Sequence, residues 1–264
     1  MSRFYYAVKV EENKAWFDDH EYRHFQVMRV EEGQRIVFTD GNGALYAGIV
    51  SFARDRTTAR ITEKISQIER SPSQRVAVGI AHAQWDREEV LIEKGTELGV
   101  TDFYLFPSRY SKYRDINLNK VSYTLRKAIK QSENPLLPTF EKFGRLEEAL
   151  ALVERYPQRI LLQPSSPTDL FDTRRQSGPA LLFVGPEGGF HPDEVQLCIR
   201  AGFTPCSIGK RILRLETAAL CGFAIQHCLS GNQLFFFFKL NYFLFCHLFF
   251  SAVGTVHEIK NQHQ

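Results

Sequence analysis

The sequence predicts a β-rich N-terminal domain, residues 1–70, followed by an α/β domain from residue 75. Two observations predict this division. Before residue 70, short apolar runs alternate with polar residues or surround glycine turns, as in half-buried strands. After residue 75, strand-like apolar runs alternate with helical segments, which predicts a parallel sheet covered by helices on both faces. The polar segment RSPSQ, residues 70–74, marks the boundary.

The clearest element of the first domain is a β-hairpin. Residues 35–50, RIVFTDGNGALYAGIV, place two apolar runs on either side of DGNG, a sequence typical of tight turns between antiparallel strands. The segments FYYAVKV (4–10) and TTARITEKI (57–65) predict two further strands.

The second domain contains the alternating elements. Strands are expected at RVAVGIA (75–81), DFYLF (102–106), RILLQ (159–163), ALLFV (180–184) and PCSIG (205–209). Helices are expected over residues 86–100, 119–132, 145–156, 192–202 and 216–229. In the first helix, Asp86 is expected as the N-cap, Glu89 at the capping-box position and Gly99 as the C-terminal stop.

Charge is distributed unevenly along the chain. The net charge is only +3, yet residues 107–130 hold seven basic residues against a single acid, Asp115. A local basic surface of this kind indicates a polyanion as partner. The alternative is a solvated basic face with two packed tyrosines, Tyr110 and Tyr113.

The cysteines indicate the compartment. The five of them, at positions 198, 206, 221, 228 and 246, include no C-x-x-C pair. This spacing and the odd number argue against a zinc site or a disulfide framework and favour a reducing compartment. The N-terminal residues carry charges where a signal peptide needs an apolar run. We therefore expect a cytoplasmic protein without a metal.

The last segment, residues 232–264, departs from this composition. Residues 234–253 are apolar over the length of a membrane span and contain eight of the 22 phenylalanines. Lys239 and Asn241 weaken a membrane interpretation, because a charge inside a bilayer is costly. Three interpretations stay open: a non-native tail from a frameshift or read-through, a C-terminal anchor, and a buried final helix.

Three loops in the last third of the chain predict a binding site. QPSS (163–166), GPEGG (185–189) and GKRILRLET (209–217) each follow a predicted strand. Ligands of open α/β sheets bind beyond the carboxyl ends of such strands, so the three loops are expected to form one site.

The loops disfavour nucleotide phosphates as ligands. The chain has neither G-x-x-x-x-G-K-[ST] nor G-x-G-x-x-G, and Glu187, Asp193 and Glu194 would repel a phosphate. A ligand with a positive centre or neutral polar edges fits better. Two structural explanations remain beside this one. The glycines could only make a tight turn, and Arg211 or Arg214 could form a structural ion pair with Glu216 or Glu187.

These motifs together resemble a known family. GPEGGF followed by P-x-E, and then SIGKRILRLETAA (207–219), resemble the signature of the RsmE family, the SPOUT methyltransferases that modify N3 of a uridine in 16S ribosomal RNA. EKGTELGV (93–100) and RYS (109–111) also match, and residues 24–43 resemble the family's PUA-like barrel. The resemblance ends near residue 230. Gln84 and Trp85 replace a usual Lys-Gly pair, and residues 128–138 lack a usual glutamate and arginine.

The resemblance implies a fold, a cofactor and partners. The fold would be a PUA-like β-barrel (1–70) and a trefoil-knot SPOUT domain (75–231), and the chain would form a homodimer. The cofactor would be S-adenosyl-L-methionine, and the partner 16S rRNA in the small ribosomal subunit. The implied cofactor-binding residues are Gln163, Gly185, Glu187, Gly188, Gly189, Ile208, Gly209, Ile212 and Leu213.

The resemblance also implies a mechanism. Arg109 or Arg214 would stabilise charge on the uracil oxygens, and Glu216 or Glu187 would accept the proton or orient an arginine. The alternative function is a non-catalytic RNA-binding protein that keeps the fold. The expected RNA-binding residues are His24, Arg29, Arg109, Tyr110, Lys112, Arg114, Arg126, Lys127 and Lys130.

Overall fold

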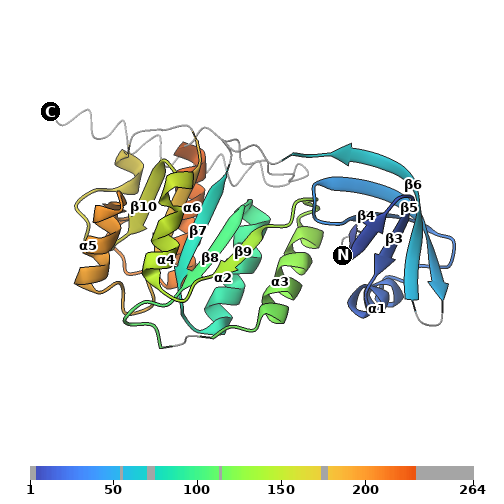
Figure 1. Ribbon diagram of the computed structural model, residues 1–264, viewed down its shortest axis with the longest axis horizontal. Coiled ribbons are helices and arrows are strands. Elements are labelled where there is room, and N and C mark those ends of the chain that lie inside the picture. Colours follow the sequence, from blue (N-terminus) through green and yellow to red (C-terminus); the bar gives the residue numbers. More distant parts are fainter. Residues whose placement is uncertain (1–3, 54–55, 70–74, 113–114, 174–177, 230–264) are drawn as a thin grey trace. The chain divides into compact units, whose positions relative to one another are not determined.

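A computed structural model describes residues 4–53, 56–69, 75–112, 115–173 and 178–229 (Figure 1). The chain divides into a compact unit, residues 1–233, and a second unit, residues 234–264. The expected linker, residues 70–74, and the C-terminal segment 232–264 with its three interpretations lie outside the described residues. No helix in the described ranges has the length and apolar character needed to cross a membrane.

The N-terminal sheet has six strands in the order β1-β4-β5-β6-β3-β2. The expected hairpin is confirmed as β4 (Arg35–Thr39) and β5 (Ala44–Ala53), which pair antiparallel and continue into β6 (Arg56–Gln67). Strand β1 (Phe4–Tyr6) pairs parallel with β4. One side of this sheet packs on a core that includes Phe25 and Phe38, both fully buried.

Residues 4–10 do not form one strand, which corrects the expectation. The chain leaves β4 after Tyr6 and pairs instead within a second hairpin, β2 (Lys9–Glu11) with β3 (Lys14–Phe17). Backbone hydrogen bonds mark the exchange of partner. Ala7 N donates to Thr39 O on β4, whereas Val8 N donates to Trp16 O on β3.

Helix α1 (Asp19–Val27) was not expected from the sequence. Its N-cap is Asp18, whose carboxylate accepts a hydrogen bond from the backbone N–H of Glu21 at 3.0 Å. An aspartate followed three residues later by a glutamate is a capping-box pattern, so residues 18–21 carried a readable signal for this helix.

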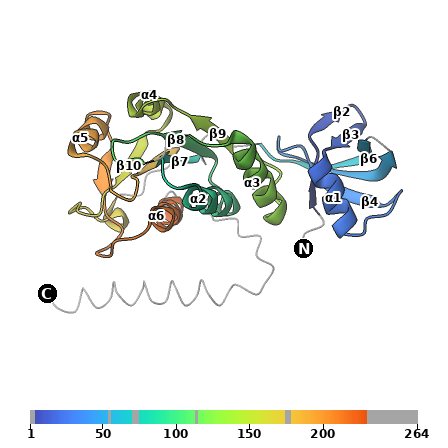
Figure 2. The ribbon, with the colours of Figure 1, turned by 90° about the horizontal axis from the view of Figure 1, so that it is seen from below.

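The second sheet is entirely parallel, with strand order β12-β10-β11-β7-β8-β9, as the alternation of strands and helices predicted. Figure 2 shows α2, α3 and α6 on one face of this sheet and α4 and α5 on the other. The strands are β7 (Val76–Ala81), β8 (Asp102–Phe106), β9 (Thr139–Lys142), β10 (Gln158–Leu162), β11 (Ala180–Val184) and β12 (Thr204–Cys206). The helices are α2 (Trp85–Leu98), α3 (Leu118–Gln131), α4 (Leu146–Leu150), α5 (Pro192–Arg200) and α6 (Leu215–Leu229).

The start of α2 differs from the prediction. Its N-cap is Gln84 rather than Asp86, and the helix begins at Trp85. The carboxylate of Glu88 reaches back to the backbone N–H of Ala83 at 2.9 Å, so a glutamate ties down the chain just before the helix. The predicted stop is confirmed, because Gly99 adopts the left-handed conformation with φ 100°.

The predicted helix 145–156 is also interrupted. Only Leu146–Leu150 is α-helical, and Ala151–Arg155 continues as a 3-10 helix. The guanidinium of Arg159 donates to the carbonyl oxygens of Val153 and Tyr156 at 3.0 and 2.8 Å. An arginine from the next strand thus takes up the last carbonyl groups, and the helix need not extend to satisfy them.

Candidate active site

The three expected loops meet at one edge of the parallel sheet. Strands β12, β10 and β11 are neighbours and run in the same direction, so the loops after them leave from the same side. A cavity of about 370 Å³ lies among these loops, within the range usual for small-molecule sites. The three loops therefore lie together around one cavity, as expected, and its use as a binding site stays a prediction.

Most of the predicted cofactor-binding residues surround this cavity. Eight of the nine line it, namely Gln163, Gly185, Glu187, Gly189, Ile208, Gly209, Ile212 and Leu213. Gly188 is the exception, because it faces the neighbouring loop. A Cβ atom added to Gly188 would lie 3.3 Å from the Cβ of Tyr110. The assignment of these residues to a cofactor stays a prediction.

At two glycines, the wall of the cavity is formed by backbone alone. Gly189 has φ 73° and Gly209 has φ 120°, conformations that residues with a Cβ rarely adopt. An added Cβ at either position would meet no atom within 4 Å. Backbone conformation therefore favours glycine here, and a ligand can approach the main chain closely.

Arg87 is a site residue that the sequence reasoning missed. It lies in the first turn of α2 and lines the cavity. Its Nε is 3.2 Å from Glu187 Oε1, and its Nη1 is 4.0 Å from Glu216 Oε2. Glu216 Oε2 is buried without a hydrogen bond. No local pattern marked Arg87, because its place beside the cavity depends on β7 lying next to β11 in the sheet, and strand order is not read from periodicity.

This arrangement changes the interpretation of the two arginines in GKRILRLET. Arg211 and Arg214 line the cavity but are exposed. Neither forms an ion pair within the described part of the chain, so the suggested structural pair with Glu216 is wrong. The two guanidinium groups remain available to an anionic or carbonyl-bearing partner.

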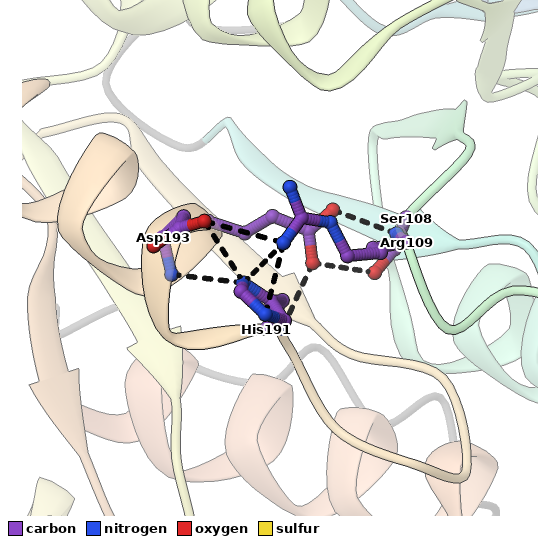
Figure 3. A network of polar contacts seen from close by, with 5 residues as sticks. Ser108, Arg109, His191 and Asp193 are labelled. Carbon is purple, nitrogen blue, oxygen red and sulfur yellow. Dashed lines mark hydrogen bonds and ion pairs between the residues drawn. The ribbon is translucent and has the colours of Figure 1, made fainter.

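Arg109 lies on the loop after β8 and does not line the cavity. Figure 3 shows its side chain among His191 and Asp193. Its Nη1 is 2.9 Å from both ring nitrogens of His191 and 3.2 Å from Asp193 Oδ2. The carboxylate of Glu194 accepts hydrogen bonds from Ser108 Oγ at 2.9 Å and from Arg109 N at 2.8 Å. The first turn of α5 therefore holds the Arg109 loop.

The predicted RNA-binding cations of α3 have internal partners. Arg126 contacts Asp18 at 3.1 Å and lies over the ring of Tyr6. Lys130 pairs with Glu21, which also contacts His24 at 3.2 Å.

Lys127 donates to Glu93 at 2.8 Å, and the hydrogen bonds from Lys127 and Lys94 lower the pKa of Glu93. Arg29, Tyr110 and Lys112 are exposed, and Arg114 lies outside the described residues. The basic segment is thus partly an internal ion-pair network, and its contact with RNA stays a prediction.

No cluster of three metal-ligating side chains occurs in the ranges that the structure describes. Burial raises the pKa of the Cys198 thiol to about 12 and that of Cys206 to about 11. Both thiols therefore stay protonated near neutral pH, and neither is suited to act as a nucleophile.

Comparison with known proteins gives the family. Residues 69–226 match the RNA methyltransferase domain family, and residues 17–64 match the RNA methyltransferase PUA domain family. The ribosomal RNA small subunit methyltransferase E of Synechocystis is 31% identical over 201 residues, which cover 73% of this chain and 65% of that protein.

Solved structures agree with this result. The ribosomal RNA small subunit methyltransferase E of Neisseria gonorrhoeae, solved bound to S-adenosyl methionine, matches with a TM-score of 0.74 and 26% identity, over 86% of this chain and 97% of that chain. A probable rRNA-methyltransferase from Porphyromonas gingivalis matches with a TM-score of 0.77 and 26% identity, over 86% and 98%. The chain, with its PUA domain and its RNA methyltransferase domain, belongs to the RsmE family.

Proposed function

We propose that this protein methylates N3 of a uridine in 16S ribosomal RNA with S-adenosyl-L-methionine as methyl donor. One observation carries the proposal: three neighbouring strand ends build a single cavity lined by eight of the nine residues expected to hold the cofactor. The S-adenosyl methionine bound to the Neisseria relative supports the choice of ligand.

The residues present fit this cofactor, which would supply a methyl group activated by a sulfonium cation. The glycine walls at Gly189 and Gly209 allow close backbone approach. Ile208 and Leu213 offer apolar surface for a flat heterocycle. The carboxylate of Glu187 is 41% exposed and lines the cavity. Its negative charge would attract a sulfonium cation and repel a phosphate.

The exposed arginines suit the uracil ring of the target. N3 must lose a proton before it can attack, and negative charge then spreads onto the ring oxygens. We propose that Arg214 stabilises this charge from the cavity rim and that Arg109 does so from the neighbouring loop. Glu216 either accepts the proton or orients an arginine.

The proposal extends to architecture and setting. Residues 1–70 would bind RNA, and residues 75–231 would form a knotted methyltransferase domain that dimerises in the cytoplasm and acts on the small ribosomal subunit. Two contacts support the knot, because Ser207 N donates to Thr168 O and Leu170 N donates to Ser207 O. The segment after β10 thus lies directly against the segment after β12.

Methyl transfer from radiolabelled S-adenosylmethionine to small subunits that lack the modification tests the function. We expect label in 16S rRNA, and mass mapping should place it on N3 of one uridine. Binding of the subunits without transfer, despite measurable cofactor binding, would instead identify the non-catalytic RNA-binding protein.

A further inference from the structure

Arg87 joins three segments that are far apart in the sequence. It belongs to the first turn of α2, whereas Glu187 follows β11 and Glu216 lies in the first turn of α6. Glu187 lines the cavity from the GPEGG loop. Glu216 does not line the cavity itself, but its neighbours Arg214 and Leu215 do, so the two carboxylates come from segments that form two walls of the cavity. One guanidinium therefore lies between carboxylates from these two walls, 3.2 Å from one and 4.0 Å from the other.

The surroundings of Glu216 make this cation important. The Glu216 side chain is only 14% exposed, and its Oε2 atom has no hydrogen-bond partner. A carboxylate in that position has lost much of its hydration, so a nearby positive charge offsets part of the cost of burying it. In the described part of the chain, Arg87 is the cation that pairs with Glu216.

We infer that Arg87 is a positioning residue that holds the two cavity walls at a fixed separation and offsets their like charge. The inference rests on the proposed function and deepens it, because it assigns to Arg87 control over the affinity for S-adenosylmethionine. Without Arg87, the negative charges of Glu187 and Glu216 would repel one another with no cation between them.

The shape of the side chain matters as well as its charge. Arg87 reaches Glu187 with Nε and Glu216 with Nη1, so two different nitrogens serve the two walls. A lysine would keep the charge but offer a single ammonium. We therefore expect Arg87→Lys to recover only part of the affinity that Arg87→Met loses.

Calorimetric titration of the full chain with S-adenosylmethionine tests the inference. We expect Arg87→Met to weaken binding by about tenfold or more, the size expected when one favourable contact is lost. Arg87→Met combined with Glu216→Gln should bind more tightly than Arg87→Met alone, because the repulsion between the walls is relieved. A role of Arg87 in packing alone would give no such recovery.

Arg200→Met is the matched control, since Arg200 is an exposed arginine at the end of α5, away from the cavity. It should bind the cofactor as the unaltered chain does. Unchanged affinity in Arg87→Met, or no recovery in the double variant, would overturn the inference about Arg87 alone. A failure of the unaltered chain to bind S-adenosylmethionine would overturn the proposed function. It would also remove the role of Arg87 in setting the affinity for that cofactor.

Urea unfolding of the unaltered chain, Arg87→Met, Glu216→Gln and the double variant tests whether Arg87 and Glu216 are coupled. Changes at Arg87 and Glu216 should be non-additive in the unfolding midpoint, because the two side chains interact. If the shift in midpoint of the double variant equals the sum of the shifts of the two single variants, no such coupling exists.

Discussion

At the scale of single residues, Glu194 connects the first turn of α5 to the loop that carries Arg109. Its carboxylate accepts hydrogen bonds from Ser108 Oγ, Arg109 N and His191 N, at 2.9, 2.8 and 2.9 Å. The third of these completes the capping box of α5. One side chain thus both starts a helix and places an arginine beside the cavity.

Replacing Glu194 by alanine should separate RNA methylation from cofactor binding. The change removes three acceptor contacts, and we expect the free energy of unfolding to fall by about 1–2 kcal/mol. Because the Arg109 loop loses its anchor, methyl transfer to RNA should fall about tenfold at saturating cofactor. Calorimetry should show cofactor affinity within about twofold of the unaltered chain, since Glu194 does not line the cavity.

Glu147→Ala is a suitable control, because Glu147 is also a glutamate in the first turn of a helix but is exposed, on α4. It should leave methyl transfer unchanged. Loss of cofactor affinity in Glu194→Ala, equal to the loss of transfer, would contradict the assigned role.

Single residues also show which parts of the site the sequence could predict. The glycines and loops around the cavity were readable because strand ends and turns are local features of sequence. Arg87 and Glu194 were missed, since each acts through partners about 85 to 130 positions away. Ion pairs over such distances depend on how strands are ordered in the sheet, which periodicity alone does not give.

At the scale of elements, a buried carboxylate joins the amino ends of three strands. Asp102 on β8 is fully buried and accepts hydrogen bonds from Arg75 at 2.6 and 3.2 Å. Thr101 and Thr139 donate their hydroxyl groups to the same carboxylate. Burial opposes ionisation of Asp102, but these hydrogen bonds outweigh it and lower its pKa.

The change Asp102→Asn should therefore destabilise the protein in a pH-dependent way. Removing one partner of a buried pair costs about 3 kcal/mol, so urea unfolding at pH 7 should show a loss of that order. Because the pKa is lower in the folded state, the unfolded chain takes up the proton more readily. The stabilisation by Asp102 is therefore complete well above about pH 4 and declines as the pH falls below that value.

The difference in stability between Asp102→Asn and the unaltered chain should accordingly narrow below about pH 4. Arg200→Met serves again as the control, because it removes a charge at the surface. Its stability should differ little from that of the unaltered chain, and this difference should not narrow below about pH 4. An Asp102→Asn difference of constant size at all pH values would contradict the role assigned to the carboxylate.

Elements were predicted well where a local pattern decides them. The strands β7, β8 and β11 and the amphipathic helix α3 follow their apolar periodicity closely. The helix at 145–156 was only partly correct, because Arg159 from the following strand binds its last carbonyl groups. The edge strand β9 was not predicted, since three of its four residues are exposed and no apolar alternation marks it.

At the scale of the whole molecule, the positive charges fall into two groups. Arg126 and Lys130 pair with Asp18 and Glu21, so their charge is balanced within the protein. Arg211 and Arg214 are exposed and have no ion pair among the described residues. The sequence predicts RNA binding for Arg126 and Lys130 and not for Arg211 or Arg214, because a sequence shows how many cations a segment has but not which acids lie opposite them.

The salt dependence of RNA binding should distinguish these two groups. A cation that contacts a phosphate displaces counterions, and losing it reduces the slope of log affinity against log salt by about one. We expect Arg211→Gln to reduce the slope in this way, measured by filter binding of 16S rRNA fragments at several salt concentrations. Arg126→Gln removes the same charge from a cation already paired with Asp18. It should leave the slope unchanged and lower the unfolding midpoint instead. Equal reductions of the slope in both variants would show that the paired cations also reach the RNA.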